Sequence, residues 1–527
     1  MRKMIFVFGM LAAAMLAMPI VAAQAQSKDA ADKGANSNEF KAEEQKSTGS
    51  VSVEGKTINY DAVAGTLVVH PKGWDDVPQD TPKDDKNPPV EASMFYVAYF
   101  KSAQPGEVRP VTFLYNGGPG SSTVWLHMGA FGPLRVVTAD DTHTPAAPYS
   151  LVSNSFSLLD ASDLVFVDAP GTGFSRIAGP NKEKAFYGID EDAHAFAEFI
   201  TQFLGKYGRW NSPKYLFGES YGTTRSAAVI ALLEGDYDVD FNGVILLSQI
   251  LSFDNSVDGP EANPGVDLPY ELALPTYAAT AWYHHKLPNG QKDLEPLLKE
   301  VEHFAMNDYA LALEQGYELP AEQRTAIAEK LHEYTGLSVE YIEKANLRID
   351  GGEFEKMLQD SNGLTTGRLD TRFSGPSMDP LSKEADYDPQ SAAISSAYVS
   401  AFNDYVRKQL KYGDDKTYKP EINTGSWNMQ HRGNEGSPNV MGDLAGAMKY
   451  NPTLKVLLNA GYYDLATPFF EGVYEMHHLP IPPSLGKNIE FKFYESGHMV
   501  YAHEASLKQL HDNVAEFITS TEGAKGK

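Results

Sequence analysis

Short apolar runs alternate along the chain with amphipathic stretches that are long enough to form helices. The runs have the length and apolarity of strands buried on both faces; they lie at residues 111–115, 163–168, 215–217, 244–247, 454–458 and 489–493. The amphipathic stretches lie at residues 190–207, 223–234 and 507–518. Because strands alternate with helices, the pattern predicts an α/β fold with a mostly parallel central sheet that is covered on both faces.

Two regions of the chain do not show this alternation of buried strands and helices: one precedes it and the other interrupts it. Residues 51–70 alternate between apolar and polar positions around turn glycines, which predicts antiparallel strands. From about residue 253 to about residue 425 the buried runs stop, and helical stretches rich in Glu, Lys and Ala take over at residues 293–315, 321–334 and 390–411. We therefore expect a core in two parts, residues 51–252 and 426–527, with an inserted and mainly helical cap at residues 253–425 between them.

The first residues have the pattern of a secretory signal. Two basic residues precede an apolar run over residues 5–23, and an Ala-x-Ala cleavage site ends at Ala25. This predicts a signal peptide over residues 1–25 and export to a periplasm or the medium. A membrane anchor is the alternative, and the small residues at the cleavage site argue against it. Residues 26–50 are rich in Lys, Glu, Ser, Gly and Asn, which predicts a disordered lead-in.

Composition narrows the classes of function. The formal net charge of −26 at pH 7 argues against a nucleic-acid partner and against binding to an anionic membrane. The chain has no cysteine, which excludes disulfides, thiolate metal sites and a cysteine nucleophile. An exported chain without disulfides fits a bacterial periplasm better than a eukaryotic secretory route. Two adjacent histidine pairs, at 284–285 and 477–478, have no matched third ligand, so we expect neither a metal nor another cofactor.

A strand–turn–helix segment carries the first candidate chemistry. The sequence GESYG at residues 218–222 follows an apolar run and precedes a helical stretch. In this context Gly-x-Ser-x-Gly places the hydroxyl of Ser220 at a helix N-terminus, and glycine flanks the serine because a side chain would clash in so sharp a turn. With 44 glycines in 527 residues, chance alone gives roughly 0.2–0.3 such motifs. The partners of the serine must therefore decide its role.

A serine nucleophile needs a base to take its proton, and the base needs an orienting carboxylate. On hydrolase sheets of this kind the order along the chain is Ser, then Asp or Glu, then His. Asp464 and His498 fit this order, because each follows a buried strand at a glycine-bearing turn. Taken singly, Asp464 could be a turn cap and His498 a loop histidine. Together with Ser220 they predict a catalytic triad.

Stabilising an oxyanion needs two backbone N–H donors. One is expected from Tyr221, the residue after the nucleophile, and the other from a Gly-rich loop that follows an earlier strand. The sequence NGGPG at residues 116–120 directly follows the apolar run 111–115 and is that loop. By itself it would be an ordinary Gly-Pro turn.

Four features in this order resemble the serine carboxypeptidases. They are NGGPG at 116–120, DAPGTGFS at 168–175, GESYG at 218–222, and the turns around Asp464 and His498. The resemblance implies an α/β-hydrolase fold with a cap, and removal of C-terminal residues from peptides. It also implies that the N–H groups of Gly118 and Tyr221 form the oxyanion hole. The substrate's terminal carboxylate would then be held by Asn116, Glu219 and the nearby Gly117 N–H.

Glu219 fills the position that the generic motif leaves variable. Two carboxylates can share a hydrogen bond only if one is protonated. A protonated Glu219 facing the substrate would favour an acidic working pH, and the resemblance supports this hypothesis. The alternative is that Glu219 has no role of its own.

Several positions depart from the family pattern. Many members have Cys where Ser121 stands, Glu where Ala130 stands, and Pro near the position of Tyr501. Arg225 replaces a more usual residue after the elbow, where it could offer a cation to the carboxylate or form a salt bridge on the helix surface. These departures indicate a divergent bacterial branch.

We therefore expect an exported serine carboxypeptidase that acts through an acyl-enzyme. An esterase or acyltransferase on the same scaffold is the nearest alternative. A catalytically silent binding protein is the alternative from a different class, and the intact Ser, Asp and His argue against it.

Overall fold

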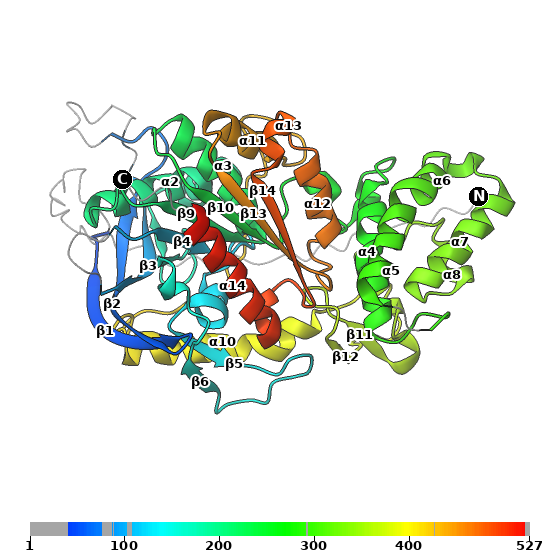
Figure 1. Cartoon of the computed structure of the whole chain (residues 1–527), viewed down its shortest axis with the longest axis horizontal. Coiled ribbons are helices and arrows are strands. Elements are labelled where there is room, and N and C mark those ends of the chain that lie inside the picture. The colour runs from blue at the N-terminus through cyan, green and yellow to red at the C-terminus, as the bar shows by residue number, and fades with distance from the viewer. Residues whose placement is uncertain are drawn as a thin grey trace, which may run out of the picture. The chain divides into compact units, whose positions relative to one another are not determined.

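The computed structural model describes residues 40–75, 87, 89–102, 108–290, 293–425 and 427–521. Within these residues ten strands form one sheet, in the order β1-β2-β3-β7-β4-β9-β10-β13-β14, with β8 paired to β3 (Figure 1). The strands are β1 Glu44–Val53, β2 Lys56–Val69, β3 Glu91–Lys101, β4 Val111–Tyr115, β7 Asp163–Val167, β8 Arg176–Ala178, β9 Lys214–Glu219, β10 Gly243–Leu247, β13 Lys455–Gly461 and β14 Ile489–Tyr494. Two small two-stranded sheets pair β5 Leu134–Val137 with β6 Ser150–Ser153, and β11 Leu364–Thr366 with β12 Ser374–Pro376.

Six neighbouring strands of the sheet run parallel to one another: β7, β4, β9, β10, β13 and β14. Strands β1, β2 and β3 form the antiparallel edge. The parallel strands are buried on both faces, so alternate residues enter different cores: Ile245 and Leu247 face one cluster, Val244 and Leu246 the other. This two-sided burial is why the strands are continuous apolar runs in the sequence. The α/β class predicted from the pattern is confirmed.

Helices cover both faces of the sheet. The helices are α1 Lys182–Phe186, α2 Ile189–Lys206, α3 Tyr221–Gly235, α4 Leu268–Tyr283, α5 Leu294–Phe304, α6 Ala310–Glu314, α7 Ala321–Thr335, α8 Val339–Lys344, α9 Gly351–Met357, α10 Pro389–Lys408, α11 Met441–Tyr450, α12 Phe469–His477, α13 Pro483–Gly486 and α14 Glu504–Thr521. Helices α2, α3 and α11 share one core with the sheet, and α10 and α14 share the other. None of the described helices combines the length and apolarity that crossing a membrane requires.

The predicted helical insertion consists of two differently packed parts. Helices α4 to α9 surround a core that extends from Val257 to Leu358 and also contains Leu465, from the turn after β13. In contrast, Phe373 and the apolar face of α10 belong to the core of the sheet, and α10 lies beside β5 (Figure 1). The part of the insertion that packs around this core therefore ends before Phe373, whereas the predicted insertion extends to residue 425. The helical period of α10 is the same in either location, so the pattern alone does not reveal which core it joins.

The lead-in predicted to be disordered over residues 26–50 is wrong for its last part. Strand β1 begins at Glu44 and pairs with β2 along its whole length. Backbone pairing and the burial of Val51 and Val53 stabilise a segment that is polar in composition. Residues 26–39 and the predicted signal peptide over residues 1–25 lie outside the described residues.

Candidate functional site

The turn between β9 and α3 has the geometry of a nucleophile elbow. Ser220 has φ 60° and ψ −131°, a left-handed conformation that is strained for a residue with a side chain. Its N–H donates to Leu247 O (3.0 Å), and its carbonyl accepts from Thr223 N (2.7 Å). A Cβ on Gly218 would lie 2.5 Å from Ser226 Oγ, so only glycine fits there. The half-buried Ser220 thus leaves the end of the strand at the N-terminus of α3.

Asp464 and His498 meet at the carboxyl ends of β13 and β14, which are neighbours in the sheet. His498 Nδ1 lies 2.8 Å from Asp464 Oδ2. The Asp464 carboxylate is fully buried and also accepts from Thr467 N (3.0 Å) and Thr467 Oγ1 (2.8 Å). Burial by itself would lower the pKa of His498, but the charges of Asp464 and Glu219 hold that pKa above its usual value. Because Nδ1 of His498 is engaged with Asp464, Nε2 is the ring nitrogen that can accept a proton.

A segment of the predicted cap holds both of these turns. We call residues 368–371, which lie between β11 and β12, the bridging segment. Four hydrogen bonds tie it to the two turns: Leu465 N to Arg368 O (3.1 Å), Thr371 N to Tyr463 O (2.9 Å), His498 N to Leu369 O (2.6 Å) and Gly497 N to Asp370 Oδ2 (3.2 Å). Sequence reasoning missed this segment, because hydrogen bonds through main-chain atoms leave no motif.

The Gly-rich loop packs directly on the elbow. A Cβ on Gly117 would lie 2.7 Å from Gly222 N and 2.8 Å from Glu219 O, so the loop touches the N-terminus of α3. Gly118 has φ 108°, which glycine adopts most readily. Tyr221 belongs to the first turn of α3, where an N–H has no acceptor within the helix. The two N–H groups named from the sequence therefore belong to adjacent segments.

Arg225 is neither on the helix surface nor free to bind a substrate carboxylate. Its side chain is fully buried, its Nε donates to Asp192 Oδ2 (2.6 Å), and its Nη1 donates to Asn116 O (2.7 Å). The guanidinium also lies 4.4 Å from the centroid of the Phe196 ring. The carboxylate role is therefore wrong, the salt bridge is present but buried instead of on the surface, and Arg225 also fixes the main chain at Asn116. The sequence drew attention to Arg225, but its burial could not be predicted, because its acidic partner Asp192 lies on another helix.

Glu219 lies in a buried polar cluster beside His498 and Asp464. It is in hydrogen-bonding reach of Asn116 and Tyr501, and it interacts electrostatically with His498 and Asp464. Burial raises the pKa of Glu219 to about 7, against the lowering effects of His498, Tyr501 and Asn116. The contacts within the cluster are imperfect, because Glu219 Oε2, Asn116 Nδ2 and the Tyr501 hydroxyl are each buried without a well-oriented hydrogen-bond partner.

Unpaired buried polar atoms are rare and each calls for an explanation. Three of them, on Glu219, Asn116 and Tyr501, belong to this one cluster. Sequence reasoning named Asn116 and Glu219 here. It noted Tyr501 only as a departure from a pattern.

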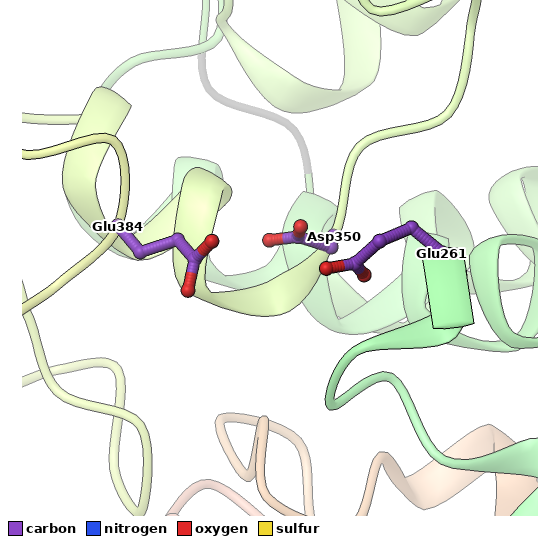
Figure 2. A group of neighbouring side chains, drawn as sticks. All are labelled: Glu261, Asp350 and Glu384. Carbon is purple, nitrogen blue, oxygen red and sulfur yellow. The ribbon is translucent and has the colours of Figure 1, made fainter. Parts of the chain in front are cut away.

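A second group of acidic side chains lies in the helical insertion. Oxygen atoms of Glu261, Asp350 and Glu384 lie within 4.8 Å of one another (Figure 2). Asp350 Oδ1 caps α9 by accepting from Glu353 N (2.7 Å), and Lys383 Nζ lies 3.4 Å from Glu384. Because a lysine already lies among these carboxylates and two of the three are exposed, the group does not call for a metal ion.

Comparisons with known proteins bear on the family and the fold of the chain. The family model for serine carboxypeptidases matches residues 85–494. Serine carboxypeptidase-like 3 of Arabidopsis thaliana is 31% identical over 173 residues, which cover 31% of this chain and 37% of that protein. The pheromone-processing carboxypeptidase KEX1 of Phytophthora infestans is 32% identical over 151 residues, which cover 26% of this chain and 22% of that protein. The alignments therefore span well under half the length of these relatives.

The structural comparison covers more of the chain. The prohormone-processing carboxypeptidase KEX1(Δ)p of Saccharomyces cerevisiae matches with a TM-score of 0.53 over 87% of this chain and 91% of that chain, at 16% identity. At this identity the likeness concerns the fold alone. Together with the sheet order and the elbow, it confirms the α/β-hydrolase fold with a helical insertion.

Proposed function

The chain belongs to the serine carboxypeptidase family, and from this premise we propose that it hydrolyses the last peptide bond of peptides with a free C-terminus. One observation carries the proposal. The buried and imperfectly paired groups of Asn116 and Glu219 lie beside His498, where a terminal carboxylate would supply the missing hydrogen bonds.

The proposed reaction begins at Ser220. Its Oγ attacks the last peptide carbonyl while His498 Nε2 takes the hydroxyl proton. Asp464 holds the imidazole through Nδ1, at 2.8 Å, and stabilises the imidazolium that forms. The N–H groups of Gly118 and Tyr221 would donate to the oxyanion of the tetrahedral intermediate.

Collapse of this intermediate breaks the peptide bond. His498 gives its proton to the departing amine, so the C-terminal amino acid leaves and the rest of the peptide remains as an ester on Ser220. Water then attacks this ester, again with His498 as the base. The products are the shortened peptide and the free Ser220 hydroxyl.

Recognition of the C-terminus is assigned to the cluster around Glu219. Asn116 Nδ2 and the Gly117 N–H would donate to the terminal carboxylate, and the protonated Glu219 carboxyl would donate a further hydrogen bond. With a pKa of about 7, Glu219 carries this proton in mildly acidic solution and loses it as the pH rises. Peptide binding should therefore weaken above neutral pH.

The test compares a blocked peptide bearing a free C-terminal carboxylate with the same peptide as its C-terminal amide. Because an amide leaves the proposed donors and acceptors mismatched, we expect kcat/KM for the amide to be lower by about 100-fold or more. Equal rates would exclude the carboxypeptidase assignment and favour a general acyl hydrolase such as an esterase. No turnover of either peptide or of small esters would favour a binding protein.

We further propose that the chain is exported. The basic start, the apolar run and the Ala-x-Ala site ending at Ala25 support this. Expression of the full chain in a bacterial host followed by mass spectrometry of the periplasmic fraction should give a mature N-terminus at Gln26. Retention of residues 1–25 on the recovered protein would contradict the proposal.

A further inference from the structure

Tyr501 is held rigidly between the acid–base pair and the wall of the Glu219 cluster. It lies in the 3-10 turn Val500–Ala502, shortly after His498 and directly before α14. Its ring packs on the backbone at Gly129, where an added Cβ would lie 2.6 Å from Tyr501 Cδ2 and 2.7 Å from Tyr398 Cε1. The side chain is only 3% exposed. Its hydroxyl therefore has a fixed position rather than a choice of rotamers.

That hydroxyl belongs to the polar cluster already described. It is in hydrogen-bonding reach of Glu219 and of Asn116, yet it has no well-oriented partner. Burial and the charge of Glu219 raise the pKa of Tyr501 well above its usual value, so the phenol keeps its proton at any working pH. The titratable groups that face Glu219 are His498, Asp464, Tyr501 and Tyr398.

The phenol and Asn116 Nδ2 are the neighbouring groups that can donate a hydrogen bond to Glu219. Asp464 accepts hydrogen bonds only, and His498 is engaged with it. Asn116 donates through Nδ2, but its Oδ1 accepts from Leu126 N (3.1 Å). The Tyr398 hydroxyl is in reach of Thr138 instead. Ala130, which follows Gly129 in the chain and is fully buried, has no polar side chain.

We propose that Tyr501 is a positioning residue that donates its hydroxyl proton to one oxygen of Glu219 and thereby fixes the other oxygen as the one that binds the substrate's terminal carboxylate. The proposal rests on the carboxypeptidase function argued above. A carboxyl that accepts from Tyr501 on one oxygen carries its own proton on the other. That proton then points to the substrate, beside Asn116 Nδ2.

In this role, Tyr501 contributes to the binding of those substrates that have a free C-terminus. Without the phenol, the Glu219 carboxyl can rotate or carry its proton on the wrong oxygen, which weakens substrate binding more than the chemical step. The phenol also favours the charged form of Glu219, so its loss should raise the pKa of Glu219 further.

The experiment compares Tyr501→Phe with Tyr398→Phe, a matched control that removes a buried phenol oxygen from the adjacent ring. Both are measured with the full chain on the free-acid peptide and on its amide, from about pH 5 to about pH 9. We expect Tyr501→Phe to raise KM for the free-acid peptide about tenfold, with a smaller change in kcat and little change for the amide. The alkaline limb of kcat/KM should move to higher pH. Tyr398→Phe should change both much less, because the Tyr398 hydroxyl is in hydrogen-bonding reach of Thr138 and not of Glu219.

A double-mutant cycle with Glu219→Gln tests whether Tyr501→Phe changes KM through Glu219. If Tyr501 acts through Glu219, adding Tyr501→Phe to Glu219→Gln should change KM much less than it does in the wild type. Additive effects, an unchanged KM in Tyr501→Phe, or equal effects of the two phenylalanine variants would each overturn the proposal. Failure of the carboxypeptidase assignment itself is recognised separately, because the wild-type protein would then cleave acid and amide equally.

Discussion

Ser220, the proposed nucleophile, and Asp464 and His498, the proposed acid–base pair, are held in place by different means. At the elbow, Ser220 is positioned by residues next to it in the sequence, by the hydrogen bond from its N–H to Leu247 O at the end of β10, and by Gly117, whose lack of a side chain lets the loop touch α3. Asp464 and His498 lie on separate turns, and the bridging segment 368–371 connects these turns through hydrogen bonds from outside both. Steric fit thus sets the first arrangement and long-range hydrogen bonding sets the second.

The difference shows where each half of the site is vulnerable. The elbow depends on glycines at fixed spacing, so almost any added side chain disturbs it. The acid–base half depends on how the chain leaves the helical insertion, since the bridging segment follows β11. The approach of Asp370 and Leu369 to the His498 turn is also close, because a Cβ on Gly497 would lie 2.5 Å from Leu369 O.

The largest expected effect is at the nucleophile. Ser220→Ala should lower kcat by about 10⁴-fold or more, because the acyl-enzyme can no longer form. A fluorophosphonate probe should label the wild type but not this variant. Ser400→Ala, an exposed position on α10, is the control and should be labelled normally. Labelling of Ser220→Ala at the wild-type level would place the nucleophile elsewhere.

Gly117→Ala tests the steric half of the comparison. Its Cβ would meet Gly222 N at 2.7 Å and Glu219 O at 2.8 Å, so the loop must move away from α3. We expect kcat to fall about 10²–10³-fold, as when an oxyanion donor is lost. Gly235→Ala, at the other end of α3 and facing open space, is the matched control. A fully active Gly117→Ala enzyme would argue against this loop as the second donor.

Gly497→Ala tests the other half. The added methyl would press on Leu369 and Asp370 and displace His498 from Ser220 while leaving the elbow intact. Because a shift of about 1 Å can cost roughly 100-fold in rate, we expect kcat and fluorophosphonate labelling to fall together. Gly446→Ala, on α11 with no neighbour in reach, should leave both unchanged. Normal labelling of Gly497→Ala would show that the bridging segment is not needed for the acid–base geometry.

The smallest expected effect separates binding from chemistry. Glu219→Gln removes the group whose pKa lies at about 7. In the wild type, kcat/KM for a free-acid peptide should fall as the pH rises through that value, because Glu219 loses the proton it donates. In Glu219→Gln this alkaline decline should disappear, with kcat/KM lower below pH 7 by about tenfold. An identical pH profile in both proteins would assign the acid preference to another group.

Much of the fold followed from the sequence pattern. The strands β4, β7, β9, β10, β13 and β14 were predicted because strands buried on both faces must be apolar throughout, whatever their neighbours. The elbow was predicted for a similar reason, since glycine at fixed spacing is a local steric requirement. What the pattern did not predict was the strand at residues 44–50, whose polar side chains belong to an exposed face.

Other features were decided only when distant parts of the chain came together. The bridging segment has no motif, because three of its four hydrogen bonds to the Asp464 and His498 turns use main-chain atoms alone. Helix α10 has an ordinary amphipathic pattern, and only packing shows that it joins the core of the sheet. Arg225 was placed correctly on α3, but its burial depends on Asp192 of α2.

The sequence by itself thus determined the class of fold, the order of the candidate triad and the identity of Glu219, since each depends on residue type and local spacing. The tertiary structure decided what surrounds Glu219. Tyr501, Tyr398 and Gly129 are far apart along the chain, and their contacts depend on how the helices close over the sheet. Hydrogen bonds act over about 3 Å, so a residue's partners, and with them its pKa and its role, are determined only when the fold sets those distances.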